Sequence, residues 1–145
     1  MNMATVASRS SSASKTGSAR VPVADEATFS TVTLRVARFD PEKDQALRWQ
    51  EFQVPYTPGM TVLDALIAVK ERQDGSLAFR SSCRMGVCGS CGMFVNGKPR
   101  LTCQTQVSEL GSVIEVAPLP NHDVIKDLVP DLSRTFERHR KVHPY

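Results

Sequence analysis

Several absences narrow the classes of protein to which this sequence can belong. Its 145 residues contain no apolar run long enough to cross a bilayer. Basic residues outnumber acidic ones by only 18 to 15, and a net charge of +3 is too mild to indicate nucleic-acid binding. No nucleophile constellation or phosphate-binding loop is present, so no catalytic site is predicted. The length and composition suit one small domain with tails.

The amino-terminal part lacks acidic residues and differs in composition from the rest. Its first 24 residues include Arg9, Lys15, Arg20 and a serine-rich run. This composition is typical of a disordered tail or a mitochondrial transit segment, and the apolar core of a secretory signal is absent. We therefore expect residues 1–28 to be a disordered tail or transit-like segment outside the folded domain.

Alternating apolar residues after position 30 predict a pair of strands. Val32, Leu34 and Val36 point to one side, while the threonines and arginine between them point to the other. The polar stretch DPEKDQAL then predicts a turn, and WQEFQV repeats the alternation through Phe52 and Val54. These two strands are expected to form a hairpin.

One helix is predicted over residues 61–72. Thr61 and Asp64 have the spacing of a capping box, and apolar residues follow at helical spacing. Three short strands are then predicted at residues 92–95, 101–105 and 113–116. The pair Asn96 and Gly97 favours a tight hairpin turn between the first two. The order of elements predicts an α+β fold, a mixed sheet with one helix packed across it.

The last segment, residues 119–145, is expected to be a linker and a helical arm. Six apolar residues recur in it near helical spacing, although Pro130 interrupts them: Val124, Ile125, Leu128, Val129, Leu132 and Phe136. We expect the apolar side of residues 124–136 to pack against a partner, or else to fold back on the sheet of its own domain.

Cysteine is scarce, and all of it lies in the stretch RSSCRMGVCGSCGMFVNGKPRLTC. The spacing is C-x4-C-x2-C-x11-C, through Cys83, Cys88, Cys91 and Cys103. Disulfides fit poorly, because Cys88 and Cys91 are too close to brace a fold and no secretory signal is present. A four-cysteine zinc-binding interaction module stays open as an alternative, although such sites favour two short chelating pairs. The spacing favours a 2Fe-2S cluster of the plant type.

Small and charged residues surround these cysteines. We expect Gly86, Gly89 and Gly92 to let the backbone curl, with positive φ, close to inorganic sulfide. Reduction takes the formal charge of such a centre from about minus two to about minus three, so nearby donors and cations favour the reduced state. Candidates for this role, which otherwise lie on the loop surface, are Arg80, Arg84, Ser90, Lys98 and Arg100.

The stretch SSCRMGVCGSCGMFVNGKPRLTCQT, together with VLDALIAVK before it and PLPNHDVIKDLVPDL after it, resembles a known family. It is similar to the amino-terminal half of the iron-sulfur subunit of succinate dehydrogenase and fumarate reductase, over most of residues 30–145. The resemblance implies a beta-grasp, 2Fe-2S ferredoxin-like domain at residues 29–118. It also implies a set of ligands to the 2Fe-2S cluster nearest the flavin of a partner: Cys83, Cys88, Cys91 and Cys103.

The same resemblance implies partners and a place in a respiratory complex. An FAD-containing flavoprotein subunit would exchange single electrons with this chain, and further clusters would carry them to or from quinone. No cysteine follows Cys103, so the 4Fe-4S and 3Fe-4S clusters of the family are expected on a separate chain, unless the sequence is a truncated product. Membrane anchor subunits would be indirect partners, and the location would be peripheral, on the inner face of an energy-transducing membrane. A stand-alone ferredoxin-type electron carrier is the alternative.

Overall fold

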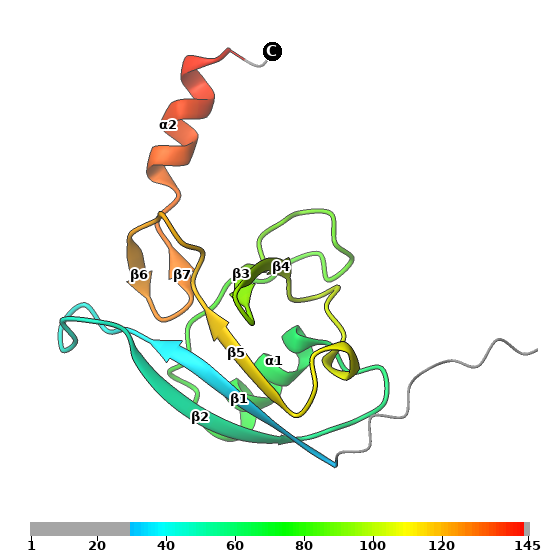
Figure 1. The fold of residues 1–145 in the computed structure, drawn as a ribbon. Coiled ribbons are helices and arrows are strands. Elements are labelled where there is room, and N and C mark those ends of the chain that lie inside the picture. Colours follow the sequence, from blue (N-terminus) through cyan, green and yellow to red (C-terminus); the bar gives the residue numbers. More distant parts are fainter. Residues whose placement is uncertain (1–29, 144–145) are drawn as a thin grey trace, which may run out of the picture.

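The computed structural model describes residues 30–143, in which a five-stranded mixed sheet is crossed by one helix (Figure 1). The expected tail or transit-like segment at residues 1–28 lies outside these described residues. The sheet has the strand order β2-β1-β5-β3-β4. Its strands are β1 (Thr31–Arg38), β2 (Arg48–Pro55), β3 (Gly92–Val95), β4 (Lys98–Leu101) and β5 (Val113–Ala117). The predicted mixed sheet is thereby confirmed.

The predicted hairpin of β1 and β2 is confirmed, and it forms one side of the core. The two strands are antiparallel, with Leu34 opposite Phe52, and β1 also pairs in parallel with β5, where Leu34 lies opposite Ile114. Val32, Leu34 and Val36 are fully buried, as their alternation indicated. This parallel pairing brings the first and the last strand of the sheet, β1 and β5, side by side at its centre.

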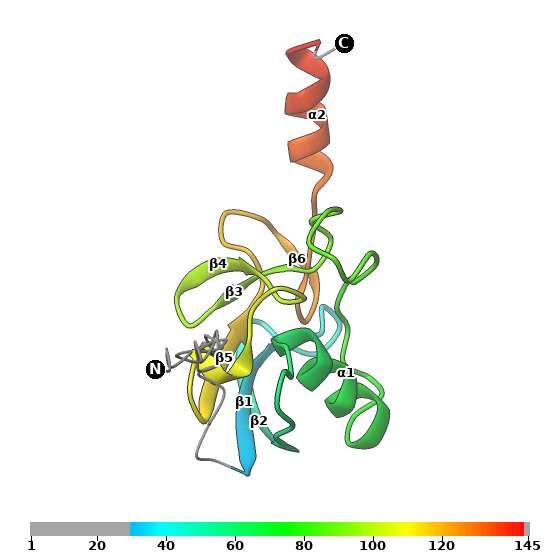
Figure 2. The same cartoon turned by 90° about the vertical axis from the view of Figure 1, so that its right-hand side faces the viewer.

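The predicted helix is confirmed as α1 (Val62–Arg72). Its capping box is complete: the backbone N–H of Asp64 donates to Thr61 Oγ1 at 3.2 Å, and the N–H of Thr61 donates to Asp64 Oδ2 at 3.0 Å. The helix buries Leu66 and Val69 against the sheet, and Figure 2 shows it lying along one face of β1 and β2. A short 3-10 turn, Val107–Glu109, follows the cysteine region.

The strand predicted at residues 101–105 is wrong in its position. Asn96 and Gly97 both have positive φ, 46° and 75°, which makes a two-residue turn that pairs Val95 directly with Lys98. The returning strand β4 therefore begins at once after the turn and ends at Leu101. The residues that follow, through Cys103, form a turn instead of a strand.

The apolar residues at 124–129, which recur near helical spacing in the sequence, do not lie in a helix. A two-stranded hairpin of β6 (Val124–Lys126) and β7 (Val129–Pro130) stands there, and only Ser133–Lys141 is helical, as α2. Leu128, at the hairpin turn, is 1% exposed and belongs to the main core of its own domain. No residue of α2 is buried, and Figure 1 shows α2 projecting away from the sheet.

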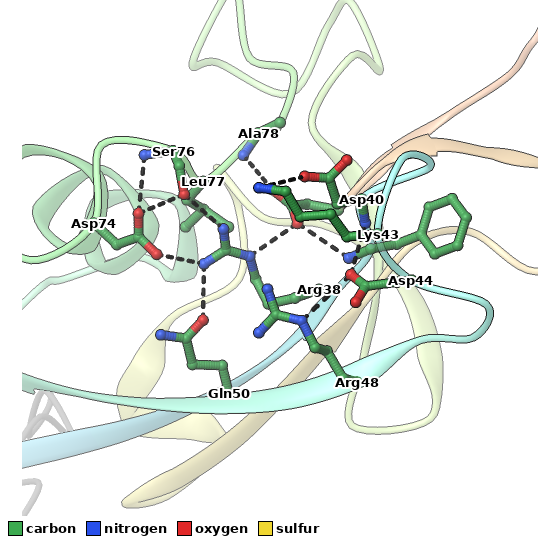
Figure 3. Close-up of polar contacts among 12 residues, drawn as sticks. Arg38, Asp40, Lys43, Asp44, Arg48, Gln50, Asp74, Ser76, Leu77 and Ala78 are labelled. Atoms are coloured by element: carbon green, nitrogen blue, oxygen red, sulfur yellow. Dashed lines mark hydrogen bonds and ion pairs between the residues drawn. The ribbon is translucent and has the colours of Figure 1, made fainter.

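A buried ion-pair network explains why the chain turns at Asp127. Arg38, at the end of β1, donates to Asp127 at 2.8 Å, to Asp74 at 2.6 Å and to Gln50 at 2.9 Å (Figure 3). It also donates to Ser76 Oγ at 2.8 Å. Burial opposes the charge on Arg38, but the hydrogen bonds that it donates to the carboxylates of Asp74 and Asp127 outweigh this effect and raise the pKa of the guanidinium. Asp127 adopts φ 47° to reach this position.

The same turn is bonded to the segment that leads into the cysteines. Asp127 accepts the backbone N–H groups of Phe39 and Ala78 at 3.1 and 2.9 Å, and its own N–H donates to Phe39 O at 2.8 Å. The N–H of Leu128 donates to Ala78 O at 3.2 Å. The chain entering the cysteine region is therefore fixed to the base of the β6–β7 hairpin.

Candidate metal centre

The four cysteines lie as two pairs. In the first pair, the backbone N–H of Cys88 donates to Cys83 Sγ at 3.3 Å, and the N–H of Met85 approaches the same sulfur at 3.5 Å. In the second pair, Cys91 and Cys103 lie in one buried cluster and are 3% and 6% exposed. The first pair lies in the outer part of the loop, where Cys88 is exposed.

The buried pair is held by Thr102 and by the start of α1. Thr102 donates to Cys91 O twice, from its backbone N–H at 3.2 Å and from its hydroxyl at 3.0 Å. The first N–H groups of α1 have no partner inside the helix. Leu63 donates its N–H to Thr102 O at 3.1 Å, and its side chain packs on Cys91 and Cys103. The helix start thereby fixes both sulfurs of the buried pair.

The loop backbone curls as expected at two of the three glycines. Gly86 and Gly89 have φ of 76° and 72°, and Arg84 also lies in the left-handed region at 56°. The expectation of positive φ at Gly92 is wrong. A Cβ atom there would lie 3.2 Å from the carbonyl oxygen of Gly89, so glycine is needed because the loop folds tightly against itself.

The pKa is lowered at one thiol of each pair, Cys88 and Cys91, and raised at Cys103. The hydrogen bond with Ser90 and the backbone of Cys83 lower the pKa of Cys88 to about 6. Burial opposes ionisation of Cys91, but hydrogen bonds with Cys103 outweigh it and its pKa is lowered, whereas burial raises the pKa of Cys103. Since thiolates are the metal-binding form of cysteine, the loop favours that form at Cys88 and Cys91 before any metal arrives.

This arrangement fits a two-iron centre. Within residues 30–143, no group of three or more histidine, cysteine or acidic side chains lies together closely enough to hold a metal ion. A 2Fe-2S cluster makes a different demand, because its four thiolates are shared between two irons. Two neighbouring pairs, one in the loop and one at the hairpin base, match that demand.

Of the polar and charged residues that the sequence placed near the cysteines, Ser90 has a hydrogen-bonding contact with a sulfur in the structure. Ser90 Oγ lies 3.1 Å from Cys88 Sγ. Arg84 lines an open cavity of about 450 Å³ between α1 and the loop. Arg80 exerts its charge on Asp131, beside the start of α2. Lys98 and Arg100 belong to β4, and Arg100 lines a shallow cavity there.

The sequence analysis overlooked two residues that contact the cysteines. Thr102 bonds Cys91 from within the core, and Gln104 Nε2 lies 3.2 Å from Cys103 O and 3.8 Å from Cys103 Sγ. Both flank Cys103 in the sequence, and this adjacency was the only available signal. Neither residue type is a metal ligand of the kind that a search for cysteine spacing detects.

Comparison with known proteins identifies the class of protein that this fold and these cysteines define. Residues 33–137 match the family of the 2Fe-2S iron-sulfur cluster binding domain, and the chain therefore belongs to that family. The cofactor expected from the cysteine spacing, a 2Fe-2S cluster, is confirmed for the domain. The ferredoxin-like fold expected from the sequence is confirmed as well.

Individual relatives narrow the resemblance. The chain is 41% identical to the fumarate reductase iron-sulfur subunit of Haemophilus influenzae over 114 residues, which are 79% of this chain and 44% of that protein. It is 42% identical to the fumarate reductase iron-sulfur subunit of Mycobacterium tuberculosis over 115 residues, 79% of this chain and 47% of that one. The resemblance seen in the sequence is thereby confirmed, and the chain spans about half the length of these relatives.

A solved structure supports the same placement. A chain of the Mycobacterium smegmatis Sdh1 complex in the apo form matches with a TM-score of 0.72 and 37% sequence identity. The match covers 77% of this chain and 46% of that chain. The likeness therefore extends to the arrangement of the elements in space as well as to the sequence.

Proposed function

We propose that this chain is an electron-transfer subunit of a succinate dehydrogenase or fumarate reductase complex. The observation that carries the proposal is the 41–42% identity to two fumarate reductase iron-sulfur subunits, over a region that includes a loop with paired cysteines. The chain would serve a succinate:quinone oxidoreductase without a catalytic site of its own. When bound, a 2Fe-2S cluster accepts and releases one electron at a time.

In this proposal, each cysteine is a ligand and each pair holds one iron. Cys83 and Cys88 bind from the outer loop, and Cys91 and Cys103 bind from the buried base. The N–H groups aimed at Cys83 and the hydroxyl beside Cys88 stabilise negative charge on these sulfurs. Burial of the second pair against Leu63 excludes water from that side of the site.

The proposed partners follow from the exposed side of the loop. Met85 and Val87 lie between the cysteines of the loop and are 68% and 79% exposed. We place the flavin-containing subunit against this loop, because electron transfer requires a short distance to the sulfurs. The division into a domain at residues 29–118 and an arm at 119–145 stays a prediction, as does the separate chain that carries 4Fe-4S and 3Fe-4S clusters.

The proposed location is peripheral, on the inner face of an energy-transducing membrane. In the part of the chain that the structure describes, α1 and α2 have 11 and 9 residues, and neither is long and apolar enough to span a bilayer. In this proposal, contact with the membrane is made through anchor subunits, with which this chain is associated only indirectly.

The proposal is tested on the tagged full chain, purified anaerobically from its native cells with whatever stays bound. We expect a flavin-containing subunit in the complex. Succinate should produce the electron paramagnetic resonance signal of a reduced 2Fe-2S cluster, and fumarate should remove it. A monomer whose cluster responds to neither compound would contradict the proposal, and the stand-alone ferredoxin would then be favoured.

A further inference from the structure

Gln104 occupies the junction between the two cysteine pairs. Its side-chain amide donates to Cys103 O at 3.2 Å and lies 3.8 Å from Cys103 Sγ, so its nitrogen is within hydrogen-bond distance of both the carbonyl and the sulfur. The residue follows Cys103 directly, after β4 has ended. Its side chain therefore extends over the sulfur from the hairpin side.

The aliphatic part of the same side chain lies against the opposite half of the site. A Cβ atom built on Gly86 would be 2.9 Å from Gln104 Cγ and 3.1 Å from Gln104 Cδ. Gly86 in turn directs its backbone N–H toward Cys103. The outer loop and the hairpin base thus meet at Gln104, Gly86 and Cys103. A side chain at position 86 would displace Gln104, and the φ of 76° there independently favours glycine.

We propose that Gln104 is a positioning residue that raises the reduction potential of the cluster. This inference rests on the proposed role of Cys103 as a ligand. Adding an electron increases the negative charge on the ligand sulfurs, and a donor beside a sulfur stabilises the form with the greater charge. The amide of Gln104 supplies such a donor, with its nitrogen 3.8 Å from Cys103 Sγ.

The test is a redox titration of the cluster-loaded full chain, followed by electron paramagnetic resonance of the reduced form. Gln104→Leu keeps the size but removes the donor, Gln104→Glu replaces it with a negative charge, and Gln104→Lys keeps a donor and adds a positive charge. The matched control is Gln73→Leu, because Gln73 Nε2 donates to Gln53 O at 2.7 Å and to no cysteine.

We expect the midpoint potential to fall in Gln104→Leu and to fall further in Gln104→Glu. Gln104→Lys should match or exceed the wild type, and Gln73→Leu should equal it. A merely structural role would not order the potentials by the charge and donor capacity of the side chain. Equal potentials in all variants, or a different order, would overturn the inference and leave the proposed function intact.

Two further outcomes are also decisive. Loss of the cluster from all three Gln104 variants would contradict the inference, because a side chain that only tunes the potential is dispensable for binding. If only Gln104→Leu loses the cluster, the midpoint potentials of the other two variants decide. A potential below that of the wild type in Gln104→Glu and at or above it in Gln104→Lys supports the inference, and any other order overturns it. A wild-type chain without any 2Fe-2S signal would overturn the proposed function itself, and the inference with it.

Discussion

The cysteine loop and the Arg38 network are built in opposite ways. The loop is open, with Cys88 exposed, three residues in the left-handed region and several N–H groups directed at sulfur. The Arg38 network is closed, because Arg38 and Asp127 are only 4% and 2% exposed and both are hydrogen-bonded. The open cysteine loop is held in place by the neighbouring Arg38 network, whose polar groups are paired. We therefore expect substitutions in the loop to affect cluster binding and substitutions in the network to affect stability.

The largest effect is expected in the loop, from Cys103→Ser. Serine is a poorer ligand than a thiolate, so the visible absorbance of the 2Fe-2S cluster should be lost almost completely. Far-UV circular dichroism should keep the signal of the sheet, because Cys103 contributes little to the main core. A variant that retains the wild-type absorbance would show that Cys103 is not a ligand.

The next effect tests the scaffold, through Asp127→Ala. Asp74 still pairs with Arg38 in this variant, but Arg38 Nε and two backbone N–H groups lose their acceptor. Each unsatisfied buried donor costs about 1–3 kcal/mol in the free energy of unfolding. The control is Lys43→Met, because Lys43 is 77% exposed and its pair with Asp40 contributes less than about 1 kcal/mol. Both free energies of unfolding are measured with denaturant. Equal decreases in the two variants would show that the buried network stabilises the fold no more than an exposed ion pair does.

A third comparison separates the β6–β7 hairpin from α2. Leu128→Ala should lower the free energy of unfolding by about 2–5 kcal/mol, because Leu128 is buried in the main core. Phe136→Ala, on α2, should change it by less than about 0.5 kcal/mol in the isolated chain, since Phe136 is 59% exposed. The reverse order would mean that α2 folds back on its own domain and that Leu128 contributes little to the core.

The smallest effect concerns acid. Hydrogen bonds from Ser76 and Arg38 lower the pKa of Asp74 from 3.8 to about 2. Because the folded-state pKa is below the unfolded one, this carboxylate stabilises the fold fully above about pH 4, and the contribution is lost as pH falls toward about 2.

Asp74→Asn should remove that dependence. The difference in thermal midpoint between wild type and variant, both prepared without the acid-labile cluster, should be constant between about pH 7 and pH 5 and should shrink below about pH 4. A difference that stays constant down to about pH 3 would mean that the Asp74 carboxylate is not stabilised by its partners.

Local patterns in the sequence predicted what depends on neighbours along the chain. The capping box of Thr61 and Asp64, the alternation through Leu34 and the cysteine spacing are all read within a few residues, and the helix, the first hairpin and the cofactor follow from them. The Asn96 turn was recognised too, but the immediate start of β4 after it was not taken into account.

Contacts between distant residues could not be predicted in the same way. The hairpin at Asp127 depends on Arg38, 89 positions earlier, and that ion pair overrides an apolar spacing that resembles a helix. Gln104 is similar, because its contact with Gly86 arises only when the loop closes on the hairpin. Its polar, exposed side chain gives no periodic signal.

The central claim is that the four cysteines hold one two-iron cluster, and chemical analysis tests it most directly. The anaerobically purified chain should contain about two iron atoms and about two acid-labile sulfides per polypeptide, with red-brown visible absorbance that Cys103→Ser loses. Zinc bound to a colourless chain without labile sulfide would contradict the account, and the four-cysteine zinc module would then take its place.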